Sequence, residues 1–314
     1  MIDPAVFDPA AIDAETAALN AEIVAKLSAL PDQWSFPPAI IRERRRQGAG
    51  PFPPLPKSSR AETVTIVGPG GPLALRVIAP AEPKGIYLHI HGGGWTLGTA
   101  DEQDPWLDRI ADRCGLACIS VEYRLAPEHP YPAAPDDCEA AALWVASEAR
   151  RRYPGPVVIG GESAGAHLAV VTLLRLRDKH GIRFSGANLF AGCYDLSLTP
   201  SVLAWGPEKL VLNTRDIRIF ADNYCGPDLD RRAPDVSPLY ADLRNLPPAL
   251  FTVGSRDLLL DDTLFMASRW VAAANRAELA VWPGGCHVFT RFESKLTERA
   301  LARIDEFLLG LNAD

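Results

Sequence analysis

The chain has 314 residues, of which 47% are hydrophobic and 23% charged, as in a globular protein with one large core. Its formal net charge of −7 argues against a nucleic-acid partner. The six cysteines are scattered without a Cys-x-x-Cys pair, so we expect reduced core residues and neither a disulfide framework nor a metal site. The start of the chain lacks a secretory signal pattern, and no apolar run reaches the length of a membrane span. We therefore expect a cytoplasmic protein without a membrane span.

The first fifty residues are predicted to form helices that precede the core. Apolar residues recur at helical spacing over residues 9–30, and a second short helix is expected over residues 39–47. This second helix ends in the arginine run 44–46, which we interpret as a solvated helix face. Residues 48–56 are rich in proline and glycine, which is typical of a linker.

From residue 62 the pattern changes to strands that alternate with helices. Two β-branched segments flank a Gly-Pro-Gly-Gly turn at residues 68–71, which predicts a hairpin. Further strands are expected over residues 85–91, 117–123, 156–160, 187–191, 249–253 and 278–282. Helices are expected over residues 106–114, 135–153, 164–179, 262–275 and 291–311. The alternation predicts an α/β fold, with a mainly parallel sheet between two helical layers. Residues 196–235 contain helical pieces but no strand, so we interpret them as an insertion that can lie over the site together with the N-terminal helices.

The sequence Gly-Glu-Ser-Ala-Gly at residues 161–165 lies between a predicted buried strand and a predicted buried helix. This context is typical of a nucleophile elbow, in which a strained turn presents Ser163 to the substrate. The backbone N–H of Ala164 can then face a developing oxyanion at the helix N-terminus. Taken alone, the pentapeptide fits a serine that caps the helix equally well.

A second motif, His-Gly-Gly-Gly-Trp at residues 91–95, directly follows a predicted strand. Successive glycines expose backbone N–H groups, which acyl transfer needs to stabilise the oxyanion. An oxyanion loop that precedes the nucleophile in the chain is the arrangement of α/β-hydrolases. His89 and His91 have no further ligand at a suitable spacing, so a metal site is not expected here.

Two further motifs supply a candidate acid and a candidate base. Asp257 follows a predicted strand, at the sheet edge where open α/β sheets bind ligands. His287 lies in the loop after the last strand, and the order Ser163, Asp257, His287 matches the Ser–acid–His order of this fold. Asp261 and Asp262 are alternative acids, and we expect one of them to cap the following helix. His167 is interpreted as a packing residue.

These motifs resemble those of the bacterial hormone-sensitive-lipase family of α/β-hydrolases, also called family IV esterases. The resemblance covers roughly residue 60 to the C-terminus, and its segments are residues 91–95, 123–128, 161–165, 237–239 and 287–289. It implies an eight-stranded core over residues 51–314 and a helical cap made from residues 1–50 and an inserted segment at about 196–235. It also implies an oxyanion hole formed by Gly92, Gly93 and Ala164. His91, Gly94 and Glu162 are assigned as supporting residues, Glu162 either through turn chemistry or by holding the elbow backbone.

Two positions depart from the family pattern. Asp257 is followed by Leu258 where the family often has proline, and Glu162 stands where many members have aspartate. The first difference concerns the turn geometry at the acid, and the second is conservative.

The leading prediction is a carboxylic ester hydrolase that forms an acyl-enzyme on Ser163, with short to medium acyl chains implied by the resemblance. It needs no cofactor, and its partner is a small-molecule ester. The alternatives are an amide or aryl-amide hydrolase with the same triad and a non-catalytic ligand receptor, against which the presence of His287 argues. A homodimer is possible. Candidate pocket residues, which are as compatible with plain packing, are Trp95, Trp205, Leu203, Phe36 and Trp34.

Overall fold

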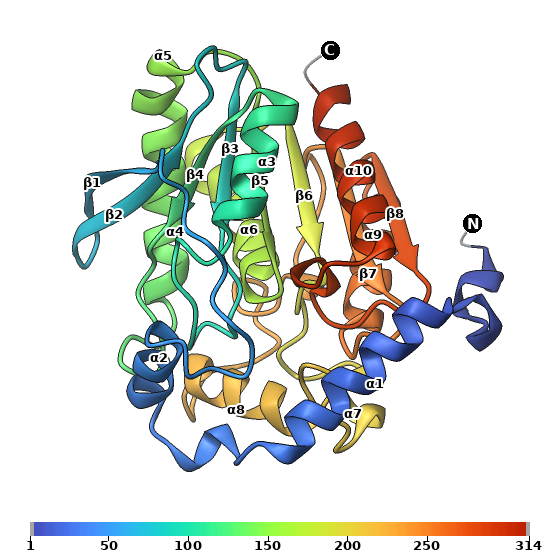
Figure 1. The fold of residues 1–314 in the computed structure, drawn as a ribbon. Coiled ribbons are helices and arrows are strands. Elements are labelled where there is room, and N and C mark those ends of the chain that lie inside the picture. Colours follow the sequence, from blue (N-terminus) through green and yellow to red (C-terminus); the bar gives the residue numbers. More distant parts are fainter. Residues whose placement is uncertain (1–2, 312–314) are drawn as a thin grey trace.

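An eight-stranded sheet organises the computed structural model, which describes residues 3–311 (Figure 1). The strands are β1 (Glu62–Gly68), β2 (Gly71–Ile78), β3 (Ile86–Ile90), β4 (Ala117–Val121), β5 (Val157–Glu162), β6 (Gly186–Phe190), β7 (Ala249–Gly254) and β8 (Ala277–Trp282). Their order across the sheet is β1-β2-β4-β3-β5-β6-β7-β8. The pairs β1–β2 and β2–β4 are antiparallel, and all later pairs are parallel. The predicted mainly parallel sheet is confirmed.

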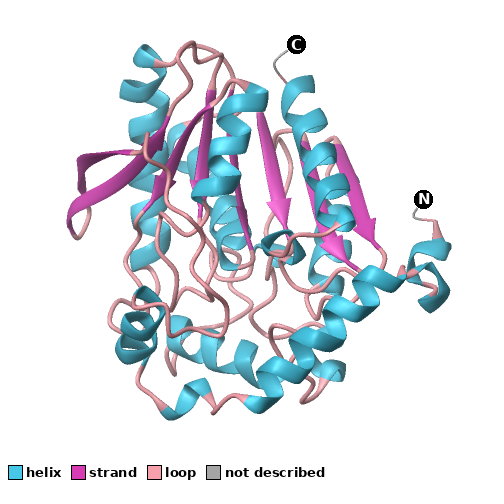
Figure 2. Cartoon of the chain, viewed as in Figure 1, coloured by secondary structure: helices cyan, strands magenta, loops and turns pink. Residues whose placement is uncertain are grey.

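Helices cover both faces of this sheet (Figure 2). Helices α3 (Asp104–Cys114) and α10 (Lys295–Gly310) contact each other on one face, while α4 (Ala133–Trp144), α6 (Ala164–Arg175) and α9 (Leu260–Ala272) cover the other. Short helical segments continue α4 and α6, namely α5 (Arg150–Arg152) and the π-helical turns at Val145–Ala149 and Leu176–His180. Within residues 3–311, every helix is too short or too polar to cross a bilayer.

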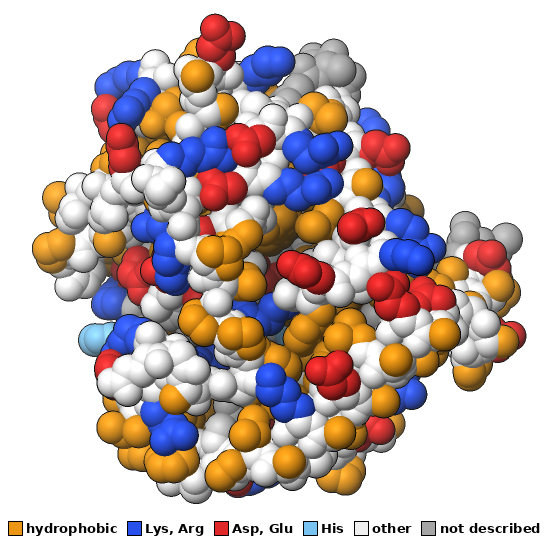
Figure 3. Space-filling view, in the orientation of Figure 1, with side chains coloured by type: hydrophobic (Ala, Val, Ile, Leu, Met, Phe, Trp, Pro, Cys, Tyr) orange, Lys and Arg blue, Asp and Glu red, His pale blue; other side chains and the backbone are white. Residues whose placement is uncertain are grey.

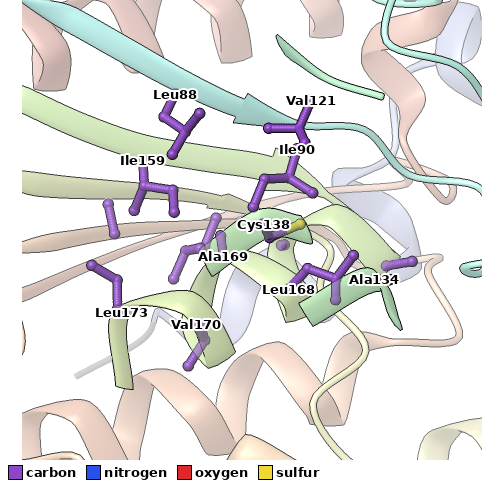
Figure 4. Close-up of a cluster of buried hydrophobic side chains, with 14 of the residues drawn as sticks. Leu88, Ile90, Val121, Ala134, Cys138, Ile159, Leu168, Ala169, Val170 and Leu173 are labelled. Atoms are coloured by element: carbon purple, nitrogen blue, oxygen red, sulfur yellow. The ribbon is translucent and has the colours of Figure 1, made fainter. Parts of the chain in front are cut away.

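The central strands are buried on both sides, which is why they appear in the sequence as nearly continuous apolar runs. Every residue of β3, β4, β5 and β6 is buried. Figure 4 shows one part of this core, where Leu88, Ile90 and Ile159 from the sheet face Ala169 and Leu173 of α6. The packing fixes the position of α6, and therefore of the turn that leads into it.

Four helices lie together beyond the carboxyl ends of the parallel strands (Figure 1). They are α1 (Ala14–Ala29) and α2 (Pro38–Arg46) from the N-terminal segment and α7 (Pro200–Trp205) and α8 (Thr214–Cys225) from the predicted insertion. We call these four the cap helices. The indole N–H of Trp34, between α1 and α2, donates to Asp216 Oδ1 on α8 at 2.6 Å, and its ring meets Phe220 edge-on at 5.0 Å. The two cap segments are therefore joined although they are far apart in sequence.

The ends of several helices differ from the predicted ranges. The first long helix begins at Ala14 and not at residue 9, because Asp13 caps it by accepting the Thr16 N–H at 2.8 Å. Residues 9–11 instead form a separate 3₁₀ turn, capped by Asp8. The last helix begins at Lys295 behind a Ser294 cap, and the four preceding residues connect it to the loop that carries His287. In each case a capping side chain decides the start more sharply than the apolar period does.

Candidate active site

Ser163 lies in the tight turn between β5 and α6, with φ 56° and ψ −121°. This left-handed conformation is strained for a residue with a side chain. The turn also needs small neighbours, since a Cβ built on Gly165 would lie 1.9 Å from the carbonyl oxygen of Ile90. Ser163 occupies the N-cap position of α6, but its side chain makes no capping hydrogen bond. The strain therefore directs the hydroxyl away from the helix.

The hydroxyl of Ser163 faces an imidazole and a carboxylate in line. His287 Nε2 lies 3.0 Å from Ser163 Oγ, and His287 Nδ1 lies 3.0 and 3.1 Å from the two carboxylate oxygens of Asp257. All three side chains are buried. A proton on Nδ1, bound to the Asp257 carboxylate, leaves Nε2 as the acceptor for the serine hydroxyl. The structure thus brings the three predicted catalytic residues together.

The carboxylates of Asp261 and Asp262 accept hydrogen bonds from residues at the start of the inserted segment. Asp262 accepts the N–H groups of Tyr194 and Asp195 and the hydroxyl of Thr199, and burial raises the pKa of Asp262 to about 7. Asp261 accepts the N–H of Ser201 at 2.8 Å. The prediction that one of them caps α9 is wrong, because the N-cap position is Leu259 and makes no side-chain cap. Both aspartates instead fix the chain that leads into α7.

One of the predicted oxyanion donors in the loop after β3 is wrong. This loop, residues 91–95, is called the glycine loop. The N–H of Gly92 donates to Glu162 Oε1 at 2.7 Å, so it is not free to bind an oxyanion. In the described part of the chain, the N–H groups of Gly93, Gly94 and Ala164 have no protein acceptor. The available donors are therefore Gly93, Gly94 and Ala164, and Gly94 moves from a supporting position to a donor position. No spacing in the sequence indicates which N–H group the glutamate takes.

Glu162 holds this loop and does not bind the backbone of its own turn. Besides Gly92, its carboxylate contacts His89 Nε2 at 3.0 Å and Gln103 Nε2 at 3.1 Å. His89 in turn bonds Ser120 Oγ through Nδ1 at 3.0 Å. The supporting roles of His89, Gln103 and Ser120 were not predicted, since these residues come from three separate segments of the chain and share no motif. Together they fix a carboxylate beside the nucleophile.

The loop is also held from its other side. The ring of His91 stacks on Tyr123 with centroids 4.1 Å apart, and the Tyr123 hydroxyl donates to the His91 carbonyl at 2.9 Å. The indole N–H of Trp95 donates to His167 Nδ1 at 3.1 Å, and His167 Nε2 bonds the carbonyl oxygen of Val236 at 2.8 Å. His167 thus connects the loop, α6 and the end of the insertion. Burial lowers the pKa of His167 to about 4, so this ring is neutral near pH 7.

A cavity of about 570 Å³ opens onto the Ser163 and His287 side chains. Figure 3 shows hydrophobic and cationic side chains around a hollow on this face of the molecule. Its apolar lining comes from α1, α2, α8, the loops that connect the cap helices, the glycine loop with the residues just after it, and the segment after His287. It includes Leu27, Leu30, Phe36, Ile41, Leu97, Val211, Leu212, Phe220, Val288 and Phe292. The size is that of a small-molecule site.

Of the five candidate pocket residues, only Phe36 lines this cavity. Trp95, at the end of the glycine loop, is buried against Tyr224, and Trp34 supports Phe220 from behind. Trp205 and Leu203 lie on α7 away from the cavity, and Leu203 is 51% exposed. The apolar lining instead includes Phe52 and Leu55 from the linker and Phe220 from α8. These have no distinctive pattern in the sequence.

Comparisons with known proteins identify the family to which this fold belongs. Residues 87–291 match the family described as the alpha/beta hydrolase fold. An esterase from Acinetobacter venetianus is 31% identical over 287 residues, which are 90% of this chain and 93% of the relative. The structure of a hyperthermophilic esterase from Pyrobaculum calidifontis superimposes with a TM-score of 0.84 at 30% identity, over 95% of this chain and 98% of that one. An esterase from the bacterial hormone-sensitive lipase family gives a TM-score of 0.80 at 28% identity, over 96% of this chain and 99% of that one.

The chain therefore belongs to the α/β-hydrolase fold family, among the hormone-sensitive-lipase-type bacterial esterases. It is a serine carboxylesterase.

Proposed function

We propose that this enzyme hydrolyses small carboxylic esters with short to medium acyl chains, through an acyl-enzyme on Ser163. The observation that carries the proposal is the line of contacts from Asp257 through His287 to Ser163 Oγ, at 3.0–3.1 Å. This line ends in a cavity large enough for a small ester.

In the first half of the reaction, Ser163 Oγ attacks the ester carbonyl carbon while its proton passes to His287 Nε2. The charged imidazole is stabilised by Asp257, which also holds the ring in place. The carbonyl oxygen becomes an anion and is bound by the free N–H groups of Gly93, Gly94 and Ala164. His287 then gives the proton to the departing alcohol oxygen, and the bond between carbonyl carbon and alcohol oxygen breaks.

The second half repeats these steps with water. His287 takes a proton from a water molecule, whose oxygen attacks the acyl-enzyme carbonyl. The same three N–H groups bind the oxyanion, and the Ser163–acyl bond breaks as His287 returns the proton to Oγ. The products are a carboxylic acid and an alcohol.

The cap helices are proposed to form the substrate-binding lid of the site, with residues 51–314 outside the insertion as the catalytic core. Support comes from the lining of the cavity, to which both cap segments contribute, for example Phe36 and Phe220. A site closed in this way excludes water from the oxyanion and strengthens its hydrogen bonds.

The test is hydrolysis of p-nitrophenyl esters from acetate to palmitate by the wild-type protein and by Ser163→Ala. We expect turnover that is highest for short to medium chains and is lost in the variant, while its thermal unfolding is unchanged. Full activity in Ser163→Ala would remove this serine from the mechanism. Turnover of aryl amides without turnover of any ester would favour the amidase alternative.

A further inference from the structure

The cavity at Ser163 has a cationic section that the ester-hydrolysis mechanism does not use. The cationic lining residues are Arg42, Arg44, Arg45, Arg46, Lys57, Lys209 and Arg291. The acidic lining residues are fewer, namely Asp32, Asp101, Glu102, Glu162 and Asp216. Several of these cations are neutralised by the protein. Arg42 pairs with Glu128, Arg46 with Glu43, and Lys57 with Asp101.

Arg45 and Arg291 form no ion pair within the residues that the structure describes. Arg45 is half-buried, and its Nε is buried without a hydrogen-bond partner among those residues. Arg291 is also half-buried, and its Nη2 donates to the carbonyl oxygen of Pro53 at 2.9 Å. The run 44–46 is therefore not uniformly a solvated face, because Arg44 and Arg46 are exposed while Arg45 turns inward.

Both side chains lie beside the linker that lines the cavity: Arg291 Nη2 bonds the Pro53 carbonyl oxygen, and a Cβ built on Gly50 would lie 3.2 Å from Cγ of Arg45. Burial lowers the pKa of Arg45, and the charge of Arg291 lowers it further, while Glu102 acts in the opposite direction. Burial also lowers the pKa of Arg291, while the charges of Glu102 and Glu162 act to raise it. Arg291 follows His287 by four positions, and both residues line the cavity. Two partly desolvated like charges favour an anion beside them.

We propose that the preferred substrate is a small ester that carries a free carboxylate, which Arg45 and Arg291 bind while the ester carbonyl lies at Ser163. A guanidinium matches a carboxylate with two parallel hydrogen bonds, and such charge-assisted pairs are strong in a partly dry site. The chemistry at Ser163 is unchanged: the acyl–oxygen bond breaks, the alcohol leaves with a proton, and water completes the acid. This inference rests on the proposed function.

Two matched pairs of esters test it, with acid release followed in a pH-stat. Methyl hexanoate and monomethyl adipate differ only in a terminal carboxylate on the acyl side, and hexyl acetate and 6-acetoxyhexanoate differ in the same way on the alcohol side. We expect wild-type kcat/KM to favour the charged member of at least one pair, and this preference to shrink as salt is added.

The variants are Arg45→Gln and Arg291→Gln, with Arg218→Gln on the cap helix α8 as the control outside the cavity lining. Loss of one charged contact should lower the charged-to-neutral ratio of kcat/KM roughly 10- to 100-fold, mainly through KM. Arg218→Gln should keep the wild-type ratio, since Arg218 is exposed and does not line the cavity. Arg45→Lys keeps the positive charge but lacks the two parallel N–H donors of a guanidinium, so it should give an intermediate ratio.

Several outcomes would overturn the inference. One is a wild-type enzyme with no preference for the charged ester in either pair, a measurement that needs no variant to fold. Another is an unchanged ratio in both Arg45→Gln and Arg291→Gln. If the wild-type enzyme hydrolyses the neutral esters but shows no such preference, only this inference fails. If it hydrolyses none of the four esters, the proposed function fails with it.

Discussion

The carboxylate of Glu162 accepts the backbone N–H of Gly92 at 2.7 Å, across 70 positions of sequence. The residue that precedes Ser163 therefore holds the first glycine of the loop that we propose binds the oxyanion. Because the bond occupies the Gly92 donor, the next two N–H groups in the loop are the ones left for the substrate. One buried hydrogen bond thus sets both the distance between nucleophile and loop and the choice of donors.

Glu162→Ala should lower kcat on the order of 10²-fold with a smaller change in KM, because small displacements of catalytic groups have effects of this size. The variant leaves the Gly92 N–H, Gln103 and His89 without their acceptor. Steady-state kinetics on a short p-nitrophenyl ester would measure the loss. Glu162→Gln should recover part of kcat, since its amide oxygen can still accept the Gly92 N–H.

Ser120→Ala is the matched control for Glu162→Ala. It removes the other partner of His89 but leaves the bond between Glu162 and Gly92 intact. Equal losses of kcat in Ser120→Ala and Glu162→Ala would show that the effect comes from the His89 side of the network and not from the glycine loop.

Gly94→Ala should lower kcat/KM on the order of 10²-fold, the scale of losing one oxyanion donor. A Cβ at this position would lie 2.2 Å from Cγ of Phe220, and the backbone has φ +59°, so the loop or the cap must shift. The same ester assay reports the loss, at a temperature where the variant is folded.

Gly71→Ala provides the comparison for Gly94→Ala. Gly71 also has a positive φ, +118°, but a Cβ there meets nothing within 4 Å, and the residue lies in the β1–β2 hairpin. This variant should lose stability and keep its activity. A Gly94→Ala enzyme with wild-type kcat/KM would contradict this prediction, because it would show that the added Cβ does not displace the N–H donors.

His167 should make a contribution to the stability of the fold that is lost in acid, while Asp262, whose pKa is raised to about 7, makes one of the opposite sign. The pKa of His167 in the folded protein is about 4, below the usual value of 6.5. Between these pH values the unfolded chain therefore binds a proton at this residue that the native protein does not bind. The contribution is complete above pH 6.5 and is lost as the pH falls toward about 4, at up to about 1.4 kcal/mol per pH unit. Urea unfolding between pH 4.5 and 7.5 would measure this slope.

His167→Gln should remove this contribution, because the substituted side chain does not titrate, so the free energy of unfolding of the wild type minus that of the variant should fall as the pH is lowered from 7.5 to 4.5. His129→Gln is the reference, since His129 is exposed in a loop. If the slope in His167→Gln equals that of the wild type, the acid sensitivity arises elsewhere in the chain.

Local patterns were enough to predict much of this protein. The periodicities distinguished strands from helices, because buried parallel strands must be apolar on both faces. The glycines at residues 161 and 165 marked the elbow, since no residue with a Cβ fits so close to Ile90. The closeness of Ser163, Asp257 and His287 could be predicted because each residue follows a predicted strand, and parallel strands bring their carboxyl ends to one edge of the sheet.

The tertiary structure decided what depends on contacts between distant segments. The sequence could not show that Glu162 takes the Gly92 donor, that Asp262 holds the inserted segment or that Phe220 rather than Trp95 faces the cavity. Arg45 and Arg46 are neighbours with the same side chain, yet the Nε of Arg45 is buried whereas Arg46 is exposed and pairs with Glu43. The physical reason is the same throughout: composition and period determine which face of an element is buried, but only the packing of elements determines what each buried polar group meets.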